Sequence, residues 1–244
     1  MTSQVVTVSR QLGSRGSYIA ARVAGVLGWR YVDREVIQRA ASAAGIPPDA
    51  LREDAGENQD VPTTAAQIVS AIGELPPVPV IASATLRESY YSDEVISALV
   101  QEEQLTRAAA AKRVAADASA YDQLTQSPEI ARELALALAE VGNIVLVGRG
   151  AQVVLQSHSG ACHVRVHAPA SLRAERLTQR TGIDLQVAHR QIRDSDRARA
   201  RHLAHGYGRA WDDVDLYHLV INTGRVNVEM ATNLIVSMVE RPVV

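Results

Sequence analysis

A segment near the start of the chain has the residue types of a phosphate-binding loop. Arg10-Gln11-Leu12-Gly13-Ser14-Arg15-Gly16-Ser17 follows the β-branched run 5–9 and precedes apolar residues at helical spacing, which predicts strand, loop and helix. Glycines let backbone N–H groups turn toward a phosphate, and a helix starting near Gly16 adds a positive partial charge. The segment therefore predicts a phosphate site at Gly13, Ser14, Arg15, Gly16 and Ser17. The alternative is a tight turn that binds no ligand.

This loop lacks the lysine of the pattern G-x-x-x-x-G-K-[ST]. Lys112 is the only lysine among the 25 basic residues of the chain. Any phosphate chemistry therefore depends on guanidinium groups and backbone N–H groups. Arg10 follows the strand directly, whereas Arg15 lies between two glycines and can point to solvent. We expect Arg10, rather than Arg15, to take the place of the lysine.

Two more charged residues stand where predicted strands end. Asp33 ends the short strand 31–33, and Arg149 follows the apolar run 144–147 after Gly148. Open α/β sheets bind their ligands outside the carboxyl ends of the strands. Asp33 is thus a ligand-site candidate or, alternatively, the N-cap of the helix that begins at Arg34. Arg149 is either a ligand group or an ion-pair partner at the end of the sheet.

A third candidate region is rich in arginine. Acidic residues are nearly absent after Asp196, so like charges four residues apart on a helix repel each other unless an anion binds them. The alternative is a solvated, charged helix. The six arginines are Arg190, Arg193, Arg197, Arg199, Arg201 and Arg209, of which the second, third and fifth share one helix face.

Composition limits the other possibilities. The 244 residues are 47% apolar and 21% charged, as in an ordinary globular protein, and the net charge of −2 argues against binding a nucleic-acid polymer or a membrane surface. No run approaches the ~18 apolar residues of a membrane span. The single cysteine, Cys162, fits a buried thiol in a reducing compartment, so we expect a cytoplasmic protein. The histidines form no metal pattern, and His163 and His167 are expected on the outer face of a strand.

Strands alternate with helices along most of the chain. This order predicts a parallel sheet with right-handed crossovers, in which the run 144–147 is buried on both faces. Residues 46–89 are polar and rich in proline, as in a loop or mobile flap. The expected strands are 5–9, 31–33, 143–147, 162–168 and 216–221. The expected helices are 16–27, 36–44, 65–72, 128–140, 169–180, 183–202 and 228–238, with one or two further helices within 92–122.

Four stretches together resemble the cytidylate kinase-like family of P-loop proteins and, more distantly, the cytidylate kinases. They are 9–20, 31–35, Val147-Gly148-Arg149 and 196–200. The resemblance implies a three-layer α/β nucleoside monophosphate kinase fold with a five-stranded parallel sheet. Residues 1–45 and 126–244 would form the core, residues 46–125 a helical insertion that binds the acceptor, and residues of about 190–209 a lid.

The resemblance also implies roles for single residues. Gly13, Ser14, Gly16 and Ser17 would form the phosphate loop, with a hydroxyl of Ser17 or Ser14 on Mg²⁺. Asp33 would face the acceptor site or the metal, and Arg149 would bind the acceptor nucleotide. The lid arginines would be Arg193, Arg197 and Arg199.

The chain departs from the cytidylate kinases at three places. They have lysine at or beside the position of Ser17, and a Ser-Gly pair where Arg34 and Glu35 follow the aspartate. They also have aspartate where Gly150 follows the Gly-Arg pair.

We therefore predict an ATP-dependent nucleoside monophosphate kinase that uses Mg²⁺ and a cytidylate-like acceptor. Nucleotides would be its ligands, and Arg10 with the lid arginines would supply positive charge during transfer. One alternative is a non-catalytic nucleotide-binding or regulatory protein on the same fold, favoured by the missing lysine. Another is a phosphotransferase acting on a different small acceptor, favoured by the unmatched middle region.

Overall fold

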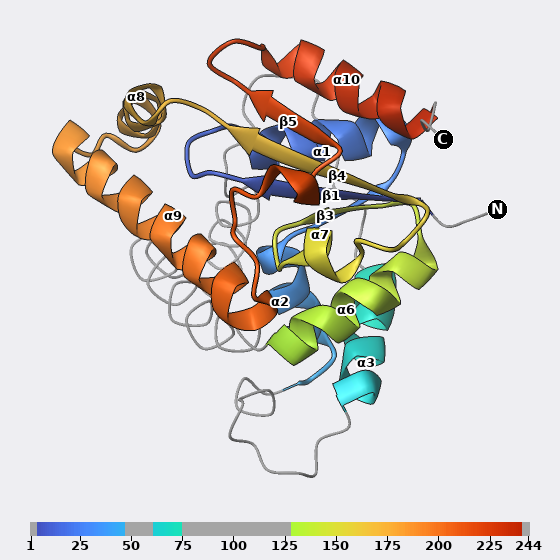
Figure 1. Cartoon of the computed structure of the whole chain (residues 1–244). Coiled ribbons are helices and arrows are strands. Elements are labelled where there is room, and N and C mark those ends of the chain that lie inside the picture. Colours follow the sequence, from blue (N-terminus) through green and yellow to red (C-terminus); the bar gives the residue numbers. More distant parts are fainter. Residues whose placement is uncertain (1–3, 47–60, 75–127, 241–244) are drawn as a thin grey trace, which may run out of the picture.

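The described part of the chain is built around a five-stranded parallel sheet (Figure 1). A computed structural model describes residues 4–46, 61–74 and 128–240. Five strands run in the order β2-β3-β1-β4-β5, and every neighbouring pair is parallel, which confirms the predicted fold. They are β1 (Val5–Arg10), β2 (Arg30–Val32), β3 (Ile144–Val147), β4 (Ala161–His167) and β5 (Leu219–Asn222).

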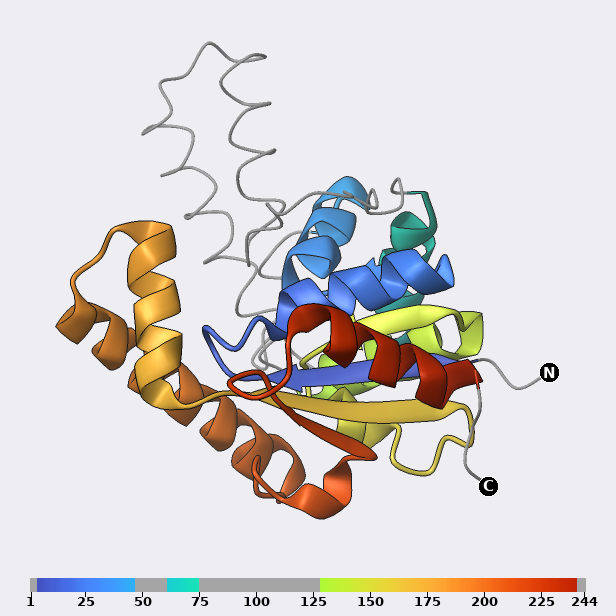
Figure 2. The ribbon, with the colours of Figure 1, turned by 90° about the horizontal axis from the view of Figure 1, so that it is seen from above.

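Helices cover both faces of this sheet (Figures 1 and 2). One face carries α1 and α10, which also pack against each other, and the opposite face carries α6 and α7. The helices α8 and α9 lie together beyond the carboxyl ends of the strands. The described helices are α1 (Gly16–Leu27), α2 (Arg34–Ala43), α3 (Val61–Glu74), α6 (Pro128–Val141), α7 (Ala151–Val154), α8 (Ala170–Thr181), α9 (Leu185–Tyr207) and α10 (Val228–Glu240).

The middle strands are apolar because both of their faces are covered. Each residue of β3 is at most 1% exposed, and Val5 through Val8 of β1 pair in register with Ile144 through Val147. A strand that is buried on both faces reads as a continuous apolar run, as predicted for 144–147. The prediction of a doubly covered central strand is thus confirmed.

The helix predicted at 65–72 is observed as the longer α3. It packs against α2 and α6, and its C-terminal carbonyls accept hydrogen bonds from the guanidinium of Arg30, at 2.9 Å from Ile72 and 2.8 Å from Gly73. This part of the predicted insertion therefore packs on the core. The one or two helices predicted within 92–122 and most of the predicted flap lie outside the described residues. The division into core and insertion therefore stays a prediction.

Two predicted boundaries near the C-terminal end differ from the structure. The helix predicted at 183–202 continues to Tyr207, because Leu203 and Tyr207 pack with Trp211 in a small apolar cluster. The strand predicted from Leu216 begins at Leu219 instead. Leu216 closes a short 3-10 helix (Val214–Leu216) and is buried in the same cluster.

The prediction that His163 lies on an outer face is wrong, since this side chain is only 3% exposed. Its Nε2 faces the carbonyl of Leu155 at 3.2 Å and therefore carries the hydrogen, while Nδ1 accepts from the hydroxyl of Thr7 at 2.8 Å. Burial, with smaller effects of His218 and His158, lowers the pKa of His163 to about 4. Cys162, expected as a buried thiol, is only partly buried, and this burial raises its pKa to about 11, so the thiol stays protonated at neutral pH.

Candidate functional site

The predicted phosphate loop joins the carboxyl end of β1 to the start of α1. The backbone N–H and the hydroxyl of Ser14 both donate to the carbonyl of Gln11, at 3.2 and 2.7 Å. Gly13 has a φ of 78°, and a Cβ there would lie 2.8 Å from the carbonyl oxygen of Arg173. Only glycine fits this position without a shift of α8. The order of strand, tight turn and helix is therefore as predicted.

The side chains of this loop differ in exposure. Ser14 is completely buried and uses its hydrogen on Gln11, whereas Ser17, in the first turn of α1, is half-buried. Ser17 is therefore the better placed of the two hydroxyls predicted to bind a metal. Arg15 is exposed at the N-cap of α1, with a φ of 64°, as expected for the tip of the loop.

Tyr31 connects the loop to the end of β2. Its hydroxyl donates to Oδ2 of Asp33 at 2.8 Å, and Ser17 lies close enough to lower the pKa of this hydroxyl. Burial and the negative charge of Asp33 raise the pKa of Tyr31 well above its usual value, although the charge of Arg10 opposes this shift. The neutral tyrosine thus brings Ser17, Asp33 and Arg10 into one group, a link that the sequence did not reveal.

Asp33 also begins α2. Its Oδ1 accepts a hydrogen bond from the backbone N–H of Val36 at 3.1 Å, which is the geometry of an N-cap residue. The alternative interpretation of Asp33 as a cap is confirmed. Its predicted role toward a metal or an acceptor is compatible with this cap and stays a prediction.

The turn after β3 has an unusual backbone. Gly148, Arg149 and Gly150 have φ values of 86°, 64° and 68° in succession. The carbonyl of Arg149 accepts a hydrogen bond from the hydroxyl of Tyr207 at 3.0 Å, so the end of α9 contacts this turn. A Cβ at Gly150 would lie 2.2 Å from the ring of Tyr207, which explains glycine at this position. The role of Arg149 as a nucleotide ligand stays a prediction.

Two arginines of α8 that the sequence did not reveal donate hydrogen bonds to backbone carbonyls of the phosphate loop. Arg173 is 4% exposed and donates from Nε to the carbonyl of Ala168 at 2.9 Å and from Nη1 to the carbonyl of Leu12 at 3.1 Å. Arg176 donates to the hydroxyl and the carbonyl of Thr223 at 3.0 and 2.8 Å. Their spacing of three residues on an amphipathic helix was the available signal.

The predicted lid arginines lie on α9 and divide into two groups. Arg193, Arg197 and Arg201 are exposed and form no ion pair with any residue that the structure describes, as predicted for one helix face. Arg199 instead contacts Asp196 at 3.9 Å and donates to the hydroxyl of Ser195. Arg209 lies beyond the helix and pairs with Asp213 at 2.8 Å. The free cationic face is therefore smaller than the six arginines suggest.

The segment after α9 is fastened to the sheet beside the loop. Arg165 of β4 is 8% exposed, donates to the carbonyl of Trp211, and lies with its guanidinium carbon 4.6 Å from the centre of the Trp211 ring. The indole N–H of Trp211 donates to Ser9 of β1 at 2.9 Å. Since Ser9 and Arg165 are register partners, this cluster anchors the base of the predicted lid.

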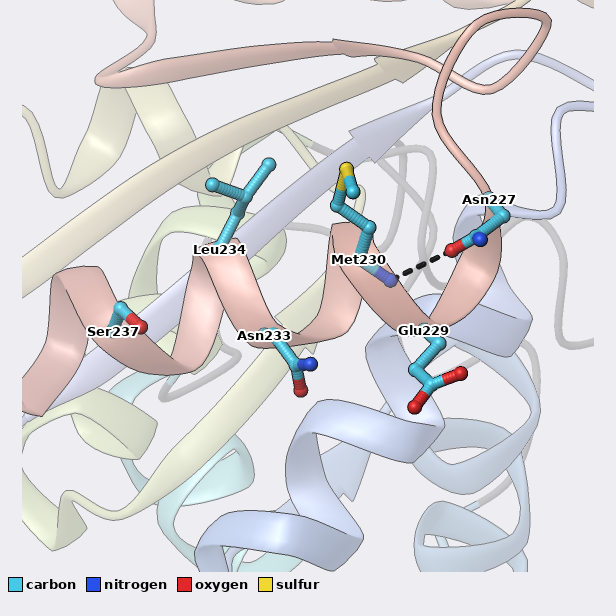
Figure 3. A pocket seen from close by; sticks show the side chains of 6 residues that line it. All are labelled: Asn227, Glu229, Met230, Asn233, Leu234 and Ser237. Atoms are coloured by element: carbon cyan, nitrogen blue, oxygen red, sulfur yellow. Dashed lines mark hydrogen bonds between the residues drawn. The ribbon is translucent and has the colours of Figure 1, made fainter.

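A hollow on the described surface lies away from the predicted site residues. A shallow hollow of about 380 Å³ lies along the exposed face of α10, where the side chain of Asn227 accepts from the N–H of Met230 at 2.8 Å (Figure 3). None of the predicted site residues lines it. Within residues 4–46, 61–74 and 128–240, no group of three or more His, Cys, Asp or Glu side chains is arranged to hold a metal ion. No helix in these ranges has the length and apolar character needed to cross a membrane.

Comparison with known proteins agrees with this geometry. The sequence profile of the cytidylate kinase-like family matches residues 5–225. The chain belongs to this family. Among curated relatives, the cytidylate kinase of Methanocaldococcus jannaschii is 30% identical over 105 residues, which cover 42% of this chain and 59% of the relative. The cytidylate kinase of Methanopyrus kandleri is 33% identical over 97 residues, which cover 36% and 49%. The cytidylate kinase-like chain thus spans about half the length of these relatives.

A solved structure supports the fold of this cytidylate kinase-like chain. An uncharacterized protein from Eubacterium ventriosum aligns with a TM-score of 0.55 at 14% identity, over 98% of this chain and 99% of that one. At this identity, the likeness concerns the fold alone.

Proposed function

We propose that this cytidylate kinase-like chain is an ATP-dependent nucleoside monophosphate kinase that uses Mg²⁺ and accepts a cytidylate-like nucleotide. One observation carries the proposal. The phosphate loop, Asp33 and the Arg149 turn follow the strands β1, β2 and β3, so all three lie at the carboxyl-terminal edge of the sheet, where the strands end. The helix with the exposed arginines is bonded to this edge through Arg173 and Tyr207. Ligands of open parallel sheets bind at such an edge.

Phosphoryl transfer requires two nucleotides held in line, neutralised charge and exclusion of water. In this proposal the N–H groups of residues 13–17 bind the donor phosphates, and the fork of Arg149 binds the acceptor phosphate. Arg193 and Arg197 supply charge from α9, and Arg199 exchanges its contact with Asp196 for a phosphate. Each of these groups stabilises negative charge that develops during transfer.

The oxygen donors at this edge suit a magnesium ion. The Ser17 hydroxyl and the Asp33 carboxylate, which both lie beside Tyr31, are hard ligands. Mg²⁺ needs only one or two protein ligands, because phosphates and water complete its shell. Bound Mg²⁺ would neutralise charge on the donor phosphates. Ser17 and Asp33 would hold it.

The test is an assay of ADP release with a panel of acceptors in the presence and absence of EDTA. We expect turnover to be highest with CMP or dCMP, lower with UMP, AMP and GMP, and abolished by EDTA. Arg149→Ala should raise the KM of the acceptor while ATP binding persists. An absence of turnover with every nucleoside monophosphate would defeat the proposal. Turnover only with a non-nucleotide acceptor would indicate a different phosphotransferase.

A second candidate function is non-catalytic nucleotide binding. The specific observation in its favour is Gly16, which stands at the start of α1 where phosphate loops that catalyse transfer carry their lysine. This candidate requires that ATP·Mg²⁺ binds, as measured by calorimetry, without release of ADP with any acceptor. Calorimetry and the ADP assay on the same preparation therefore separate the two functions.

A further inference from the structure

Glycine at position 16 is explained by the side chain of Arg10. A Cβ built at Gly16 would lie 2.4 Å from Cβ of Arg10 and 3.1 Å from its Cγ, and the first of these distances is closer than real Cβ contacts come. Arg10, the last residue of β1, therefore folds over the first residue of α1. No side chain at position 16 is compatible with Arg10 in this place.

The guanidinium of Arg10 reaches the turn after β3. A Cβ at Gly148 would lie 2.6 Å from Nη1 of Arg10, so a side chain there would displace the guanidinium, and the φ of 86° independently favours glycine. The Nε of Arg10 donates to the hydroxyl of Ser17 at 3.4 Å. Neither terminal nitrogen donates a hydrogen bond to any residue that the structure describes, and none of the described ion pairs involves Arg10. The guanidinium fork thus lies between the phosphate loop and the Arg149 turn with its strongest donors unused.

The sequence pattern gives this position a meaning. When G-x-x-x-x-G-K-[ST] is laid on the chain with its last position at Ser17, its lysine falls on Gly16 and its first glycine falls on Arg10. The second glycine of the pattern falls on the exposed Arg15. The cation and the glycine have exchanged places between the end of the strand and the start of the helix. The space that the missing side chain leaves at position 16 is the space that Arg10 fills.

We propose that Arg10 is the phosphate-binding cation of this loop. Its side chain extends from the end of β1 over Gly16, whereas the usual lysine extends from the start of the helix. The proposal rests on the proposed function, because its ligand is the polyphosphate of the donor nucleotide. A guanidinium suits this role, since its fork binds two phosphate oxygens at once. Its seat against Gly148 also places the charge between the donor loop and the turn that carries Arg149.

The first test is calorimetric titration of ATP·Mg²⁺ into the parent chain, Arg10→Met and Arg225→Ala. Methionine keeps an unbranched stem over Gly16 and removes the charge, while Arg225→Ala removes an exposed cation outside the loop. We expect Arg10→Met to lose affinity roughly ten- to a hundredfold, because a charge-assisted contact is lost, and Arg225→Ala to stay within about threefold. Equal affinity of the parent and Arg10→Met overturns the inference and leaves the kinase proposal standing. A parent that does not bind ATP·Mg²⁺ overturns both.

The second test exchanges the two positions. Arg10→Gly alone removes the cation, and Gly16→Lys alone has no space for its side chain, so each single variant should bind ATP·Mg²⁺ weakly. The double variant Arg10→Gly with Gly16→Lys restores the first glycine and the lysine of the usual pattern, with Arg15 still at its second glycine. It should regain at least about tenfold in affinity over Arg10→Gly. A double variant that binds no better than Arg10→Gly contradicts the proposed exchange.

The third test displaces the guanidinium without removing it. Gly148→Ala forces Nη1 of Arg10 away and should weaken ATP·Mg²⁺ binding. Gly182→Ala is the matched control, because Gly182 has a similar φ of 73° but no atom within 4 Å of its built Cβ. Unfolding midpoints of all variants separate a loss of binding from a loss of fold. Equal binding by the two alanine variants contradicts the placement of the cation against Gly148.

Discussion

Arg173 of α8 and Asp196 of α9 form an ion pair at 2.9 Å, and the same Nη1 of Arg173 donates to the carbonyl of Leu12 at 3.1 Å. One buried guanidinium therefore connects the predicted lid helix with the phosphate loop. Its Nε is used on the carbonyl of Ala168, so the side chain is fixed by backbone on one side and by a carboxylate on the other. The geometry of the loop thus depends on a residue that no phosphate-loop pattern contains.

Removing this guanidinium should destabilise the protein. Arg173→Met leaves the carboxylate of Asp196 and two carbonyls without their donor, which should lower the free energy of unfolding by about 3 kcal/mol. Glu175→Ala, an exposed change on the same helix, should stay within about 0.5 kcal/mol. Urea unfolding followed by circular dichroism measures both. A loss below about 1 kcal/mol for Arg173→Met would show that the pair contributes little.

Gly150 offers a second test of stability, in which steric contact and backbone strain can be separated. Gly28 and Gly150 have nearly the same φ, 67° and 68°, but only at Gly150 does a built Cβ meet another atom, the ring of Tyr207 at 2.2 Å. Gly28→Ala should cost about 1 kcal/mol through strain alone. Gly150→Ala should cost about 1 to 3 kcal/mol more through the clash.

The control for this pair is the removal of the ring. Combining Gly150→Ala with Tyr207→Ala should cost less than the sum of the two single changes, as measured by thermal or urea unfolding. Additive costs would indicate that the ring moves away freely and that glycine is needed for its backbone conformation only.

Local patterns predicted most of the fold. The glycine loop between an apolar strand and a helix, and the run 144–147 between glycines, each depend on neighbours within about ten residues. The parallel sheet followed from the alternation of such elements. Boundaries were wrong where distant residues decided them, as when Trp211 packing extended α9 to Tyr207 and turned Leu216 into part of a 3-10 helix.

The parts of the candidate site that the sequence did not reveal are long-range contacts. The buried His163 hydrogen-bonds with Thr7, 156 residues earlier in the chain. Arg173 stabilises the phosphate loop through its hydrogen bond to the carbonyl of Leu12, 161 residues earlier. Local sequence patterns around His163 and Arg173 do not predict contacts with Thr7 or Leu12. The Arg10 side chain illustrates the intermediate case, because its type and position were noticeable, whereas its seat on Gly16 and Gly148 required coordinates.

His163 should make stability depend on pH. Its pKa is about 4 in the fold and 6.5 in the unfolded chain, so between these values the unfolded chain binds a proton that the folded chain does not. Stability is therefore complete above about pH 6.5 and falls as the pH drops toward 4, by up to about 3 kcal/mol. Urea unfolding of the parent and of His163→Gln at several pH values tests this. A variant with the same dependence as the parent would assign the effect to other groups, such as His167 and His202, whose pKa values burial also lowers.

Asp33 allows its cap role and its proposed metal role to be separated. Asparagine is as good an N-cap as aspartate, so Asp33→Asn should keep stability within a few tenths of a kcal/mol, whereas Asp33→Ala should lose about 1 kcal/mol. If the carboxylate also faces Mg²⁺, Asp33→Asn should lower the Mg²⁺-dependent rate by at least about tenfold, because an amide does not neutralise the cation. The measurements are urea unfolding and ADP release. Parent-like turnover in Asp33→Asn would leave Asp33 as a cap only.

The exposed arginines of α9 should respond to anions. Arg193, Arg197 and Arg201 lie four residues apart on one face without ion-pair partners among the described residues, so their mutual repulsion loosens the helix until a phosphate neutralises them. Hydrogen exchange of α9 amides should slow on the order of tenfold when ATP·Mg²⁺ and CMP are both present, while amides of the buried helix α6 change little.

A matched variant makes this last test specific to the charges. Replacing Arg193 and Arg197 with glutamine keeps helix propensity and removes the repulsion, so α9 of the double variant should exchange more slowly than the parent without ligand and gain little protection with it. Its rate of ADP release should fall at least about tenfold, since two cations that stabilise the transferred phosphoryl group are lost. If α9 of the parent protein is equally protected with and without ATP·Mg²⁺ and CMP, α9 is an ordinary solvated helix. The lid arginines would then have no part in the reaction.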